Sequence, residues 1–186
     1  MIKRIAIMAM MLSLAIILSI LESFIPVFVP GFKLGLANVI ILIMLYEFKA
    51  YEAFTVLILR IIIQALLRGT IFEPVFFMSL CGGLISYLVM WLFSRMRLFT
   101  PIGVSVMGAV FHSTGQILVA MVIMSTAAIL YYLPFIALLS LGTGILSGLI
   151  AYTYLKISIT SKFISVRKYD KKKNDLNDNS AGLNEE

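Results

Sequence analysis

The sequence predicts an all-α integral membrane protein with six transmembrane helices, and its composition and its apolar segments are the observations that predict it. Hydrophobic residues make up 61% of the 186 residues and charged residues 13%, and the mean hydropathy is +1.05. An ordinary soluble domain carries about 25% charged residues. Long apolar segments alternate with turns that contain Pro, Gly or charges. We expect a transmembrane domain over residues 1–156 and a flexible, charged cytoplasmic tail over residues 157–186.

The first expected helix covers Ile5–Leu21 and follows two basic residues. It is about as long as a membrane core requires and no A-x-A cleavage site follows it, so we do not interpret it as a signal peptide. Ala6, Ala9 and Ser13 fall at spacings of three and four. This small-residue face could pack closely on a helix of a partner protein or on a helix of the same chain.

An apolar loop, Glu22–Lys33, follows the first helix and resembles a lid or re-entrant segment because it contains prolines and a glycine among aliphatic and aromatic residues. The later helices are expected at Leu34–Tyr46, Tyr51–Leu67, Pro74–Ser94, Pro101–Ser125 and Pro134–Lys156. Gly82-Gly83 and Gly144-x-x-x-Gly148 are expected close-packing points within two of them.

The distribution of Lys and Arg predicts the orientation in the membrane. With six spans, both termini and most basic residues fall on one side, namely Lys3, Arg4, Lys49, Arg95, Arg97, Lys156 and the bases of the tail. Only Lys33 and Arg68 fall on the other side. The positive-inside rule makes the first side cytoplasmic, so the chain is expected to be a multi-pass protein of the cell membrane.

Arg60, Gln64 and Arg68 are spaced four residues apart and form a polar stripe on one face of the third expected helix. An ionisable residue inside a span normally faces protein or a water-filled cavity, so it indicates a functional site. At 1.5 Å per residue, Arg60 lies roughly 14 Å and Gln64 roughly 20 Å from the cytoplasmic start of the helix, with Arg68 near the outer surface.

His112 and Gln116 lie at matching depths, roughly 17 Å and 22 Å, on the fifth expected helix. With Asn38 and Lys33 they complete an expected cationic, outward-facing ring that binds substrate. Structural roles stay open for several members. Arg68 could be interfacial or pair with Glu73, Lys33 could pair with Glu22, and His112, Asn38 and the glutamines could join helices.

Arg60 is the hardest member of the ring to explain structurally, because no acidic residue lies inside an expected span. A bound anion is the expected partner, and helix carbonyl ends or water are the alternatives.

Several catalytic classes are absent from the sequence. All three aspartates, Asp170, Asp175 and Asp178, lie in the tail, and there is one cysteine and one histidine. The sequence has no Walker A, G-x-S-x-G or His-Glu-x-x-His motif. We therefore expect no metal site, no cofactor and no catalysis by this chain. The net charge of +6 does not indicate nucleic acid, because the bases lie mostly at the ends of apolar segments.

The segments Pro30–Asn38 (PGFKLGLAN) and Gly108–Gln116 (GAVFHSTGQ) resemble the Gx transporter family, whose members are often labelled heptaprenyl diphosphate synthase component I. That family in turn resembles the substrate-binding S components of energy-coupling factor (ECF) transporters. The resemblance covers about Ile5–Lys156.

The resemblance implies a six-helix S-component-like bundle that binds a small, anionic nutrient or cofactor precursor from outside. Its implied partners are a transmembrane coupling protein, which would dock on Ala6, Ala9 and Ser13, and a pair of ATPases. The family label implies an alternative, a non-catalytic membrane partner of a soluble prenyl diphosphate synthase. The other expected contacts are membrane lipid and the substrate itself.

Overall fold

The computed structural model describes residues 2–22, 24, 35–96 and 98–182, and for Lys3, Ile159 and residues 161–182 it describes the backbone alone. The chain divides into two compact units, Met1–Tyr152 and Thr153–Glu186. The first unit holds the packed helices and all the residues of the expected site. The second unit is the distal part of the last helix together with the C-terminus.

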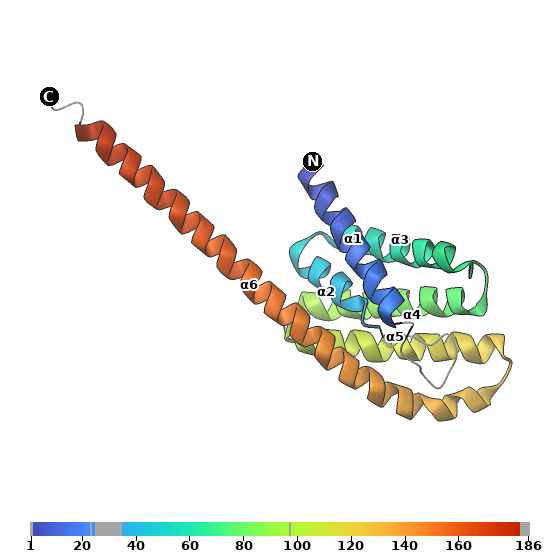
Figure 1. Cartoon of the computed structure of the whole chain (residues 1–186). Coiled ribbons are helices and arrows are strands. Elements are labelled where there is room, and N and C mark those ends of the chain that lie inside the picture. The colour runs from blue at the N-terminus through green and yellow to red at the C-terminus, as the bar shows by residue number, and fades with distance from the viewer. Residues whose placement is uncertain (1, 23, 25–34, 97, 183–186) are drawn as a thin grey trace. The chain divides into compact units, whose positions relative to one another are not determined.

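The secondary-structure elements among the described residues are all helices, with no strand, which confirms the all-α fold class (Figure 1). Among the described residues, five segments are long and apolar enough to cross a membrane. The elements are α1 (Ile2–Glu22), α2 (Asn38–Glu47), α3 (Ala50–Arg68), α4 (Pro74–Met96), α5 (Pro101–Ile123), the 3-10 helix η1 (Ala127–Tyr132) and α6 (Leu133–Gly182).

Helix α2 differs from its prediction. It begins at Asn38, four residues after the expected start at Leu34, which lies outside the described residues. The turn before it includes Gly35 in the left-handed region, with φ of 86°. The 10 residues of α2 extend about 15 Å, half of a hydrocarbon core of about 30 Å. The expected count of six spans is therefore not confirmed by helix length.

Helix α2 nevertheless lies at the centre of the first unit. Its residues from Asn38 to Met44 are buried on all sides, as expected for a helix that is apolar all round. It packs against α1, α3, α4 and α5. Ile41, Leu42 and Met44 of α2 join Leu57 of α3 and Met90 of α4 in the main hydrophobic cluster.

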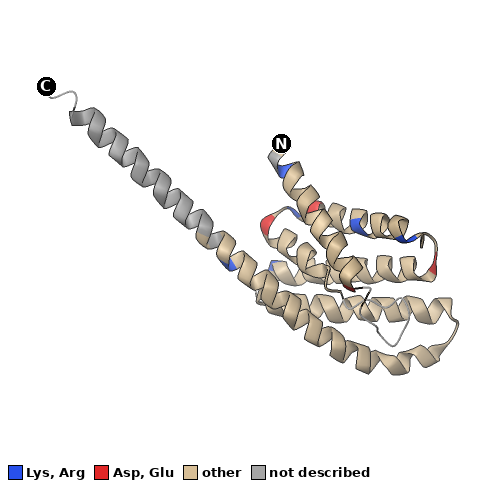
Figure 2. Cartoon of the chain, in the orientation of Figure 1, with Lys and Arg blue, Asp and Glu red and all other residues tan. Residues whose placement is uncertain are grey.

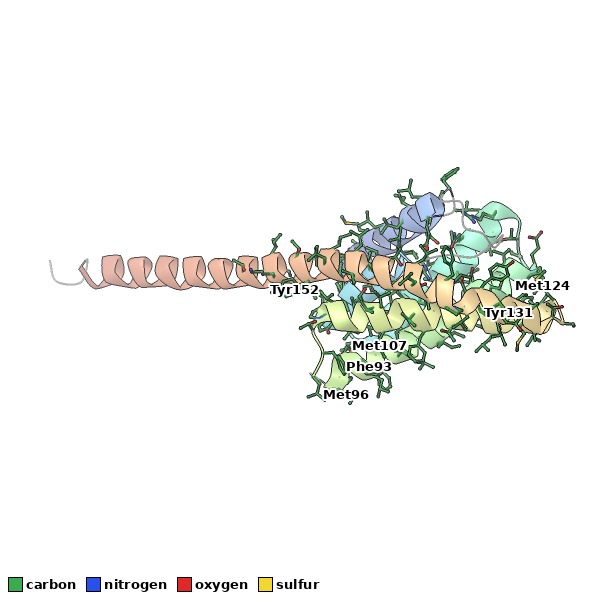
Figure 3. The ribbon with its side chains drawn as sticks, turned by 90° about the horizontal axis from the view of Figure 1, so that it is seen from below. Phe93, Met96, Met107, Met124, Tyr131 and Tyr152 are labelled. Atoms are coloured by element: carbon green, nitrogen blue, oxygen red, sulfur yellow. The ribbon has the colours of Figure 1, made fainter. Side chains whose placement is uncertain are left out.

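Helices α3, α4 and α5 lie side by side, and α4 packs along both of its neighbours (Figure 1). The start of α1 is tied to the start of α3 by an ion pair of 2.8 Å between Arg4 and Glu52. Met96 and Tyr152 lie at one end of the bundle, and Met124 and Tyr131 at the other (Figure 3). Figure 2 shows that α5 carries no charged residue along its whole length.

The expected close-packing glycines are confirmed. A Cβ on Gly82 would lie 2.8 Å from the His112 carbonyl oxygen, and one on Gly83 would lie 3.0 Å from Ile61 Cδ1. Cβ atoms on Gly144 and Gly148 would lie 2.8 and 2.7 Å from backbone atoms of α5. These glycines therefore allow α4 to approach α3 and α5, and α6 to approach α5.

Hydrogen bonds between two pairs of serine side chains also join α6 to α5. The hydroxyl groups of Ser105 and Ser147 lie 3.0 Å apart, and those of Ser113 and Ser140 also form a hydrogen bond. The backbone of α6 stays helical to Gly182, beyond the expected end of the helix at Lys156. The flexibility expected of residues 157–186 stays a prediction.

Candidate functional site

Arg60 lies in the middle of α3 and is 5% exposed. Its Nη1 donates to Asn38 Oδ1 at the first residue of α2, over a long distance of 3.5 Å. Its Nε–H has no hydrogen-bond partner among the described residues. A buried donor without a partner costs about 1–3 kcal/mol. The guanidinium thus retains hydrogen-bonding capacity that a ligand or a water could use.

Asn38 connects Arg60 to α4 and to the turn before α2. Its side-chain amide donates to the Ser86 hydroxyl of α4 at 3.1 Å. A Cβ on Gly35 would lie 3.1 Å from Asn38 Nδ2 and 3.5 Å from His112 Cδ2. The start of α2 therefore lies between Arg60 of α3 and His112 of α5, and Arg60, Asn38 and His112 share one neighbourhood, as expected. Ser86 was not predicted as a member.

Glu22 requires a correction. It was expected in the loop that follows the first helix, whereas it is the last residue of α1 and is 4% exposed. Its carboxylate accepts a hydrogen bond from the Gly35 amide and attracts Arg60 electrostatically. The premise that Arg60 lacks an acidic neighbour is therefore wrong. The physical reason is that α1 extends far enough to carry its last residue into the protein interior.

His112 and Gln116 form the α5 side of the cluster. Gln116 Nε2 lies 2.9 Å from His112 Nε2. The amide of Gln116 and the imidazole of His112 are therefore within hydrogen-bond distance of each other. The two side chains are 3% and 0% exposed and pack against Gly82 of α4. The prediction that they share a face and lie together is confirmed.

Gln64 does not join this group through any described hydrogen bond. Its Oε1 accepts from the Ser19 hydroxyl of α1 at 2.6 Å, and its Nε2 donates to the Ser19 carbonyl at 3.3 Å. Gln64 therefore joins α3 to α1, which is the interhelical role left open for the glutamines. The sequence does not indicate that Ser19 bonds with Gln64, because a lone serine in an apolar helix is common.

Arg68, an expected site residue, lies outside this buried cluster. Arg68 is exposed at the end of α3 and, like Glu73, forms no ion pair with a described residue. Arg68, Gln64 and Ser79 are among the residues that line a small cavity of about 10 Å³. This volume has room for about one water molecule. The Ser79 hydroxyl is buried and has no hydrogen-bond partner among the described atoms. Lys33 lies outside the described residues.

The small-residue face of α1 does not pack on the described remainder of the chain. Ala6, Ala9 and Ser13 are exposed, and the Ser13 hydroxyl bonds back to the Ala9 carbonyl at 2.9 Å. Helix α1 packs instead through residues such as Ala15 and Ser19, which are 0% and 2% exposed.

The described side chains include no group of three or more His, Cys, Asp or Glu residues that could hold a metal ion. What the buried cluster offers is one cation, one carboxylate, two side-chain amides, an imidazole and the Ser86 hydroxyl. Such a set can bind and orient a small polar molecule, because its donors and acceptors come from five helices, with His112 and Gln116 both on α5.

Comparison with known proteins identifies one family. The family model described as heptaprenyl diphosphate synthase component I matches residues 11–154. No curated protein and no solved structure matches the chain. The matched region includes the start of α2 and the middle of α3, α4 and α5, so the whole buried cluster lies within it.

Proposed function

The chain belongs to the heptaprenyl diphosphate synthase component I family, and we propose that this protein is the substrate-binding membrane subunit of an ECF-type importer. It captures a small nutrient or cofactor precursor from the outer face of the cell membrane. The observation that carries the proposal is the buried Arg60, whose Nε–H is unpaired among the described atoms and whose polar neighbours Asn38 and Glu22 come from α2 and α1. Buried ionisable residues in a span mark substrate pathways.

The chemistry of the cluster selects the substrate class. An acidic group of the substrate would accept hydrogen bonds from Arg60, with Asn38, His112 and Gln116 as orienting groups. Glu22 offers a carboxylate in the same neighbourhood. The substrate therefore carries an acidic group, and it can also carry a basic or hydroxyl group that Glu22 would bind. Lys33, Gln64 and Arg68 belong to the wider proposed site around this cluster.

The path of the chain supports six crossings with both termini in the cytoplasm. Helices α1 and α3 run in the same direction, because Arg4 pairs with Glu52 near their starts and Ser19 bonds with Gln64 near their ends. This parallel course supports a return across the bilayer between α1 and α3, in which the short helix α2 would take part. The positive-inside rule then assigns the end with Arg4, Lys49 and Arg95 to the cytoplasm.

The exposed face of Ala6, Ala9 and Ser13 supports docking to a transmembrane coupling protein that works with a pair of ATPases. Small residues let a partner helix approach closely. The face is accessible in the described chain, because all three residues are exposed.

The family description favours a second candidate function, a non-catalytic membrane component of a heptaprenyl diphosphate synthase complex. In that case the partner is a soluble prenyl diphosphate synthase. Co-purification of the tagged protein distinguishes the candidates: coupling protein and ATPases are expected for an importer, and a prenyl synthase for the alternative.

The binding site is tested by mass spectrometry of small molecules extracted from the purified protein. We expect wild-type protein to retain a polar compound with an acidic group, and Arg60→Ala to lose it. Arg95→Ala is the matched control, because it removes an exposed arginine at the end of α4, outside the proposed site, and should retain the compound. Equal retention by Arg60→Ala and wild type, with both proteins folded, would refute the site.

A further inference from the structure

A second polar cavity, of about 640 Å³, lies at the end of the bundle where α3 begins and α4 ends. It is separate from the buried cluster around Arg60 and shares no lining residue with it. Its polar and aromatic lining consists of Tyr46, Phe48, Lys49, Tyr51, Trp91, Ser94 and Arg95.

Two basic side chains line the cavity, and one of them, Lys49, also attracts the Glu52 carboxylate. Lys49 and Arg95 are both exposed, and neither is within ion-pair distance of a described carboxylate. Glu52, which lies close by on α3, is paired with Arg4 at 2.8 Å. Glu47 is the other nearby carboxylate and does not line the cavity. Two cations therefore line one cavity, where they attract an anion.

The walls of the cavity are held in place by contacts between α3 and α4. The Tyr87 hydroxyl of α4 donates to the Ala50 carbonyl at the start of α3, at 2.8 Å. The rings of Tyr87 and Phe54 pack with their centroids 5.4 Å apart. Lys49 Nζ lies 5.8 Å from the centroid of the Tyr51 ring. The cavity is thus bounded by helix ends that are fixed relative to each other.

The surface of α4 beside the cavity indicates an amphiphilic occupant. Leu88, Trp91, Leu92 and Arg95 follow helical spacings of three and four, so they form one stripe. Leu88 and Leu92 are 57% and 54% exposed, and Trp91 is 37% exposed. An apolar chain could lie along the leucines while an anionic group reaches Arg95. Trp and Tyr at this level are typical of the membrane–water interface.

We propose that this cavity binds the phosphate group of an anionic phospholipid, with Lys49 and Arg95 as the counter-charges and the acyl chains along the α4 stripe. Basic pockets between membrane helices bind lipid headgroups in this way. The same phosphate chemistry could be supplied by a free anion. The exposed leucines favour the lipid, because a soluble anion has no apolar chain to pack against them.

The test uses the full-length protein in nanodiscs of phosphatidylglycerol mixed with phosphatidylcholine, followed by native mass spectrometry of the lipid that remains bound. We expect preferential retention of phosphatidylglycerol. The double variant Lys49→Gln/Arg95→Gln should reduce this preference roughly thirtyfold, and each single variant roughly fivefold. The control Arg68→Gln removes an exposed arginine at the other end of α3 and should keep the preference.

A second measurement separates the two sources of phosphate. Inorganic phosphate is added to detergent-purified protein and thermal unfolding is recorded. Stabilisation by inorganic phosphate that is lost in the double variant, without a lipid preference, would assign the cavity to a free anion and overturn the lipid proposal. A phosphatidylglycerol preference that survives in the double variant would overturn the site itself.

Discussion

The backbone amide of Gly35 donates a hydrogen bond to the carboxylate of Glu22, which lies thirteen residues earlier in the chain. Glu22 ends α1 and Gly35 lies in the turn before α2, so this bond ties the end of one helix to the start of another. The same carboxylate attracts Arg60 of α3. Glu22 therefore connects the backbone geometry before α2 with the buried charge of the candidate site.

Replacing Glu22 tests this connection. Glu22→Gln keeps an oxygen that can accept from Gly35 but removes the negative charge that attracts Arg60. Removing one partner of a buried charge pair destabilises a protein strongly. We expect the free energy of unfolding in detergent to fall by about 1–3 kcal/mol, measured by thermal or denaturant unfolding.

A double-mutant cycle with Arg60→Met supplies the control. If Glu22 acts through Arg60, the double variant Glu22→Gln/Arg60→Met should be more stable than the sum of the two single effects predicts, by about 0.5–3 kcal/mol. Strictly additive effects would show that the Glu22 charge does not act through Arg60 and would refute the connection.

Most helices could be predicted from the sequence because hydropathy and turn residues define them locally. Pro74 and Pro101 begin their helices as expected. Thr100 caps α5 by accepting from the Gly103 amide at 3.3 Å, and Gly69 ends α3 in the left-handed region. The start of α2 was predicted too early, since apolar residues near Leu34 do not reveal where a glycine turn ends.

The candidate site could be predicted only in part. Helical periodicity shows which residues share a face, so His112 and Gln116 were grouped correctly. Periodicity does not show which helix a face meets, and Gln64 faces Ser19 of α1. Glu22 was missed for a similar reason, because the loop composition after it indicated exposure while tertiary packing buries it.

Gly82 is predicted to set the distance between α4 and α5. In Gly82→Ala the added Cβ would lie 2.8 Å from the His112 carbonyl and 2.9 Å from Gln116 Cγ. The helices must separate, which typically costs about 1–3 kcal/mol in a packed core. We expect a lower melting temperature in detergent together with weaker retention of the bound small molecule.

Gly142→Ala is the matched control for this prediction. Gly142 also lies within a helix, α6, but a Cβ there would meet nothing within 4 Å. The substitution should leave stability unchanged or raise it slightly, because alanine favours helix more than glycine. An equal loss of stability in both variants would mean that glycine itself, rather than the contact with His112 and Gln116, determines the effect.

The exposed small-residue face of α1 yields a prediction about assembly. Ala9→Leu places a bulky side chain where a partner helix would approach, so co-purification with a transmembrane coupling protein should fall about five- to thirtyfold, since a lost or strained helix contact is worth about 1–2 kcal/mol. Folding should be unaffected because Ala9 is exposed. The control Ala128→Leu makes the same change at an exposed position of η1 and should leave co-purification intact. Equal recovery of the coupling protein with wild type and Ala9→Leu would exclude this face as the docking surface.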